Sequence, residues 1–167
     1  LGWFNDPILT TSLKDDDYEL ASTVLHELVH RTMWIKGDVS LNESLAQFVG
    51  LEAMTRFYKG TNKEISALIY KDNWHMLASL IEKLYSNLEN AYDSDISKEE
   101  KLSKKKEFFE QFHIEVNKIF PNSKLLAKPN NAELMQLKLY TGKYSEFDEV
   151  LRKNNGDIIS LINHYKE

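Results

Sequence analysis

The fold is decided by Val24–Gly50, "VLHELVHRTMWIKGDVSLNESLAQFVG". Two apolar segments stand on either side of the polar sequence "KGDVS", and this pattern predicts two helices joined by a short loop, so that the second can return antiparallel to the first. We expect the Asn42 side chain to cap the second helix. Ala46 and Gly50 follow on that helix as small residues at which the two helices can approach closely.

The rest of the chain continues the helical pattern. Residues 15–34 are apolar on nearly all sides, which predicts a helix buried in the domain. Two amphipathic stretches between residues 61 and 120, separated by the polar sequence "DSDIS", predict a long antiparallel helical hairpin. Shorter helices are expected over residues 131–140, 144–154 and 157–166. The apolar stripes of the hairpin include Leu68, Leu77, Leu80, Leu84, Phe108, Phe112 and Val116.

Composition narrows the fold class and the chemistry. The 167 residues include only three prolines and six glycines, most of them between the periodic segments, so we predict a mostly α fold forming a single domain over residues 1–167. A net charge of −5 argues against nucleic acid as a partner. The chain has no cysteine, so any metal would have to be bound by His, Asp or Glu. No apolar run is long enough to span a bilayer.

The sequence "HELVH" supplies a metal-ligating pattern. His26 and His30 are one helical turn apart on one face, so two imidazoles can reach a single ion. Glu27 projects to the side of that pair, where a carboxylate can accept a proton from a water molecule as the water attacks a carbonyl group. Catalytic zinc takes three protein ligands, and Glu43 in "LNESLA" is the candidate for the third. The alternative is a buried helix whose two histidines are satisfied by hydrogen bonds.

These residues resemble the gluzincin metallopeptidases, zinc enzymes that share HExxH on one helix and a glutamate ligand on the next. The sequence "NESLA" is similar to the "NEGFA" of aminopeptidase N-like members. The interval between His30 and Glu43 is shorter than is usual in those enzymes. The resemblance therefore implies zinc held by His26, His30 and Glu43, with Glu27 as the general base and a tighter connecting loop.

A second resemblance covers nearly the whole chain. The segments "LGWFNDPIL", "HELVH", "LNESLAQF", "NNAEL" and "LYTGKYSEFDEVLRKNNGDI" resemble, in motif and in order, the bacterial predicted-aminopeptidase family, which shares the short interval. This resemblance implies a gluzincin-like catalytic helical domain that forms the C-terminal part of a longer protein. Members often carry a lipoprotein-type signal. The resemblance thus implies a place in the bacterial cell envelope or periplasm, with a membrane contacted only through a lipid anchor outside this chain.

Other polar residues in the family-like segments are candidates for binding substrate. Asn130 and Asn131 in "NNAEL" could bind the substrate backbone, and Tyr140 or Tyr144 could donate a hydrogen bond to the oxyanion, as tyrosines commonly do in gluzincins. Each has an ordinary alternative, because asparagine caps helices and tyrosine packs on its neighbours.

Two aspartates have similarly open roles. Asp6 in "LGWFNDP" could hold the free amine of a substrate, or it could cap a helix that begins at Pro7. Asp38 could orient a ligand histidine from outside the metal shell, or it could serve the turn at Gly37.

Three functions remain open at this point. The first is an aminopeptidase acting on peptides through a zinc-activated water. The second is a zinc endopeptidase with an extended cleft. The third is a non-enzymatic helical binding module that uses the hairpin over residues 61–120 and keeps a residual metal site. The presence of Glu27 favours an enzyme, since a structural metal site needs no base.

Overall fold

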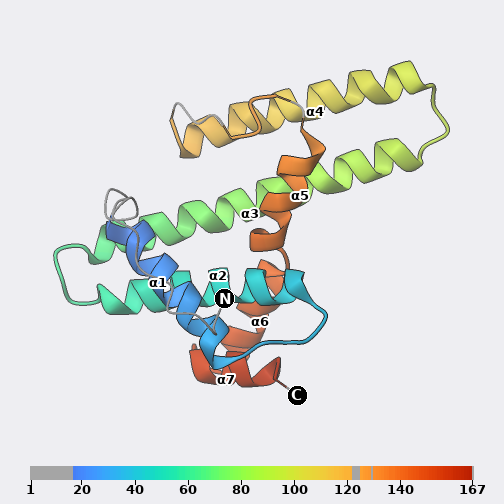
Figure 1. Ribbon diagram of the computed structural model, residues 1–167. Coiled ribbons are helices and arrows are strands. Elements are labelled where there is room, and N and C mark those ends of the chain that lie inside the picture. Colours follow the sequence, from blue (N-terminus) through green and yellow to red (C-terminus); the bar gives the residue numbers. More distant parts are fainter. Residues whose placement is uncertain (1–16, 122–124, 129, 167) are drawn as a thin grey trace. The chain divides into compact units, whose positions relative to one another are not determined.

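A computed structural model describes residues 17–121, 125–128 and 130–166, which form seven helices with no strand among them (Figure 1). The helices are α1 Asp17–Thr32, α2 Val39–Phe57, α3 Glu64–Asp93, α4 Lys98–Ile119, α5 Asn131–Thr141, α6 Tyr144–Lys153 and α7 Ile158–His164. The predicted mostly α fold is confirmed. The chain divides into two compact units, one made by Asn73–Thr141 and the other by the chain on either side of that segment. The assignment of all 167 residues to one catalytic domain stays a prediction.

The first unit is built around α2. Leu45, Phe48, Leu51 and Met54 on this helix are fully buried, and α1, α6 and α7 pack against it. The expectation that the preceding helix is buried on all sides is wrong, because Leu28 on α1 is 49% exposed. α1 packs with one face on α2, so an apolar side chain on its opposite face remains in contact with solvent. The central helix of this unit is therefore α2.

The start of α2 also differs from the prediction. Asp38 is the N-cap residue, and its carboxylate accepts a hydrogen bond of 2.9 Å from the backbone N–H of Leu41. Asn42 is therefore not the cap, and it lies a full turn inside the helix. Aspartate and asparagine are both good N-caps, so the two candidate starts could not be told apart by residue type. Of the two roles considered for Asp38, the structure shows the one at the turn.

The two small residues on α2 lie where α1 comes closest. Ala46 is fully buried. A Cβ atom at Gly50 would lie only 2.8 Å from the backbone oxygen of Ser22 and 3.1 Å from the backbone nitrogen of His26. Both neighbours are backbone atoms and cannot turn aside as a side chain would. The close approach predicted for these helices is confirmed, and it depends on the absence of a side chain at Gly50.

Gly50→Ala is expected to destabilise the protein by about 1–3 kcal/mol, because the added methyl group must push α1 and α2 apart. Alanine is the better helix former by about 1 kcal/mol, so the clash has to exceed that gain. Ala53→Gly, in the same helix, measures the propensity difference separately. Urea unfolding of both variants and the parent provides the comparison. A Gly50→Ala protein as stable as the parent would contradict the importance of this contact.

The second unit contains the predicted helical hairpin. The part of α3 from Asn73 onward packs against α4 (Figure 1), and both helices contribute to one apolar core. Its buried members are Leu77, Ile81, Leu84, Leu88, Phe109, Phe112, Val116, Leu126 and Leu134, with Leu80 and Phe108 partly buried beside them. Ser97 and Glu100 form a capping box that starts α4 immediately after the turn. Leu68 was wrongly placed in the apolar stripe, since it is 41% exposed and belongs to the first unit.

The shorter helices expected near the C-terminus are present as α5, α6 and α7. Asp157 caps α7 by accepting hydrogen bonds from the backbone N–H groups of Ile159 and Ser160. Across the described parts of the chain, none of the helices combines the length and the apolar character needed to cross a bilayer.

Candidate metal centre

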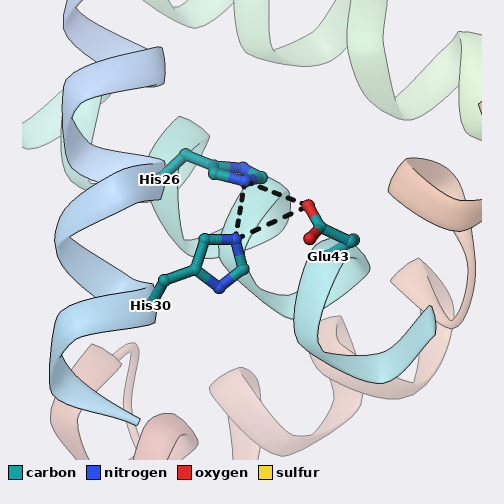
Figure 2. A group of neighbouring side chains, drawn as sticks. All are labelled: His26, His30 and Glu43. Carbon is teal, nitrogen blue, oxygen red and sulfur yellow. Dashed lines mark hydrogen bonds and ion pairs between the residues drawn. The ribbon is translucent and has the colours of Figure 1, made fainter. Parts of the chain in front are cut away.

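Three side chains from α1 and α2 converge in the first unit (Figure 2). The Nε2 atoms of His26 and His30 are 3.0 Å apart. The Glu43 Oε2 atom lies 3.3 Å from Nε2 of His26 and 3.5 Å from Nε2 of His30. Figure 2 shows both imidazole rings turned toward the Glu43 carboxylate. The spacing of the two histidines on α1 and the packing of α1 against α2 together produce this group.

The loop between the two helices is held by Asn42. The Asn42 Oδ1 atom accepts a hydrogen bond of 2.8 Å from the backbone N–H of Ile35. Its Nδ2 atom donates to the backbone oxygens of Ile35 and Asp38, each at 2.7 Å. The loop between the end of α1 and the start of α2 is short. Asn42, the residue before Glu43, anchors this loop to α2.

The environment of His26 favours its neutral form. Burial, followed by the effect of the neighbouring His30, lowers the pKa of His26 below its usual value. The carboxylates of Glu43 and Glu27 and a hydrogen bond with the Gln47 side chain act in the opposite direction. A neutral imidazole has a lone pair available for a metal ion, whereas an imidazolium has none.

The donor set fits a metal ion. A tetrahedral zinc with ligand distances of about 2.0–2.1 Å has ligand-to-ligand separations of about 3.4 Å, close to the three separations between these atoms. Two imidazoles and one carboxylate would supply three ligands and would leave a fourth position for water or substrate. The described residues contain one group of this kind, and His26, His30 and Glu43 could hold a metal ion.

Glu27 lies beside this group and not within it. It follows His26 on α1, which turns it about 100° around the helix axis from that histidine. Its side chain is half-buried, and its charge is close enough to His26 to affect the pKa of that imidazole. Glu27 is therefore close to His26, and its role as a base stays a prediction.

The candidate substrate residues have contacts of their own. Asn130 caps α5 by accepting from the backbone N–H groups of Ala132 and Glu133. Asn131, in the second unit, donates to the Tyr92 hydroxyl at 3.3 Å. Tyr140 also belongs to the second unit, and the substrate roles of Asn131 and Tyr140 stay predictions.

Tyr144 and Asp6 complete the set of candidates. Tyr144 lies in the core of the first unit, where its ring packs edge-on against Phe48 at 5.3 Å. Burial raises the pKa of Tyr144 above its usual value, so its hydroxyl stays protonated at ordinary pH. The packing interpretation therefore accounts for Tyr144. Asp6 lies outside the described residues.

Sequence reasoning missed two neighbours of the histidines. Trp34 packs its ring against the His30 ring, with centroids 5.6 Å apart, and its side chain is 57% exposed. Gln47 forms a hydrogen bond with His26. Both lie four residues after a metal-ligand candidate, Trp34 after His30 and Gln47 after Glu43, so the helical spacing itself could have indicated them.

No curated protein and no solved structure matches the chain. A family model described as "Putative aminopeptidase" matches residues 1–167.

Proposed function

Because the chain belongs to the putative aminopeptidase family, we propose that it is a zinc-dependent aminopeptidase whose metal is held by His26, His30 and Glu43. The observation that carries the proposal is the convergence of these three side chains from two separate helices. Neutral imidazole and carboxylate ligands without any thiolate suit catalytic zinc. The place in the bacterial cell envelope implied by the family resemblance is part of this proposal.

The residues divide into those that bind the metal and one that moves protons. His26, His30 and Glu43 would hold a zinc ion, which would supply Lewis acidity to polarise a carbonyl group and to make a water molecule more acidic. Glu27 takes a proton from the attacking water and later gives it to the departing amine nitrogen. Burial of His26 lowers the pKa of its imidazole, which favours the neutral form that can bind a metal ion. The Glu43 carboxylate contributes a negative charge that offsets part of the charge of a divalent cation.

We expect purified protein to contain one zinc per chain and to cleave a peptide with a free amino terminus. The same peptide with an acetylated amino terminus should resist cleavage, since an aminopeptidase binds the free amine. Elemental analysis gives the metal content, and mass spectrometry of the two digests gives the sites cut. Removing the metal with a chelator should stop cleavage, and adding zinc back should restore it.

The other outcomes separate the alternatives. Equal internal cleavage of both peptides would identify an endopeptidase. A zinc-loaded protein that cleaves neither peptide would contradict the proposed hydrolysis and favour a helical binding module. Protein that binds no divalent metal would contradict the proposed centre itself.

A further inference from the structure

Asn42 stands out as a buried polar residue beside the metal centre that no catalytic step uses. Its side chain is almost fully buried, at 3% exposure, and makes three hydrogen bonds to backbone groups of the loop before α2. These bonds use the amide oxygen once and both hydrogens of the amide nitrogen. No side chain with only acceptors or only donors could replace all three.

The loop that Asn42 holds is tied to the centre at both ends. On one side of Ile35 stands Trp34, whose ring packs against the His30 ring. On the other side the loop leads into α2, where Asn42 itself precedes Glu43. The Asn42 side chain thus holds the loop that carries Trp34, which packs against His30. It also belongs to the residue that directly precedes Glu43. The cap at Asp38 fixes the start of α2 but makes no such link back to Ile35.

We infer that Asn42 is a positioning residue of the metal centre, which acts by clamping the loop so that Glu43 and the Trp34-supported His30 face the same point. This inference rests on the proposed metal centre but not on the reaction catalysed there. Losing the clamp would leave the three ligands present and free to spread apart. The expected consequence is weaker metal binding in a protein that still folds.

Metal affinity tests the inference directly. Asn42→Ala is expected to weaken zinc binding by about 10–100-fold, the range usual when a residue that supports a metal ligand is lost. Competition with a chromophoric chelator measures the affinity, and the visible spectrum of the Co²⁺-loaded protein reports the coordination geometry. Asn42→Asp keeps the acceptor for Ile35 but loses both donors, so it should also bind more weakly than the parent.

Ser44→Ala is the matched control. Ser44 is fully buried and lies beside Glu43, but its hydroxyl donates to the Ser40 backbone oxygen within α2 and not to the loop. Both substitutions should lower the thermal midpoint of the metal-free protein, because each removes a buried hydrogen-bonding group. Only the Asn42 variants should change zinc affinity and the Co²⁺ spectrum.

A further measurement reads the loop itself. With Trp3 and Trp74 replaced by phenylalanine, Trp34 is the remaining tryptophan. Its fluorescence anisotropy should fall when Asn42→Ala is added and stay unchanged with Ser44→Ala.

The experiments can contradict the positioning role of Asn42 and the proposed peptidase activity independently of each other. A folded Asn42→Ala protein with parental zinc affinity would overturn the positioning role, whether or not the parent hydrolyses peptides. A parent that binds zinc but cleaves no peptide would remove the proposed function and leave this role testable and intact. A parent that binds no divalent metal would overturn both.

Discussion

Glu27→Gln is expected to reduce peptide hydrolysis by about 10²–10⁴-fold, the usual contribution of a general base, while zinc content stays at one per chain. Glutamine is nearly isosteric with glutamate, and Glu27 is close to His26 but does not belong to the group of three ligand candidates. Fold and metal affinity should therefore survive the change. The measurement is zinc content and peptide turnover, determined side by side on the same preparations.

Glu19→Gln is the control for this experiment. It makes the same chemical change on the same helix, at an exposed position in the first turn of α1. Turnover by this variant should equal that of the parent. If Glu27→Gln were as active as the parent, the base would have to be another group, and the assignment of Glu27 would be wrong.

Glu43→Ala and His26→Ala are expected to lose metal and activity together. Each leaves only two of the three ligand atoms that now lie within 4.8 Å of one another. The loss of affinity should exceed the roughly 10–100-fold that follows removal of a supporting residue. Equilibrium dialysis against zinc, followed by elemental analysis, gives the bound metal. The same samples are then assayed for peptide turnover.

The contrast between these variants and Glu27→Gln is the informative result. Loss of metal with Glu43→Ala and retention with Glu27→Gln would separate the ligand from the base. Zinc retained at parental affinity by Glu43→Ala would show that this carboxylate is no ligand. Far-ultraviolet circular dichroism of the metal-free proteins checks that each variant is folded.

Periodicity and spacing were enough to predict much of this structure. The interval between His26 and His30 is a property of any α-helix, so their shared face followed from the sequence alone. The core of the hairpin followed from repeating apolar positions such as Leu77 and Phe112. The small residue at Gly50 indicated where α1 and α2 meet.

What could not be predicted depends on tertiary packing. Leu28 and Leu68 are apolar at helical spacing, but none of the described helices covers them enough to bury them. Composition alone does not show which apolar positions another element will cover. Asp38 and Asn42 are equally good caps in isolation. Asp38 becomes the cap because of the path that the loop takes in the folded protein. This path also brings the backbone groups of Ile35 and Asp38 within hydrogen-bonding distance of the Asn42 side chain. The division into two units was likewise not predicted, because no change in amino-acid composition indicated a boundary between them.

The contact at Gly50 has a consequence for the size of ion that the proposed metal centre would accept. Backbone atoms of Ser22 and His26 rest against this glycine, about two turns along α2 from Glu43. Main-chain contact therefore sets the gap between the two helices at this point. Flexible side chains could adapt the separation between the ligand atoms to each cation. A contact between backbone atoms would instead fix this separation before any cation binds. If the proposed centre binds a divalent ion, we expect discrimination between small and large ions to depend on Gly50, a residue that would not touch the ion.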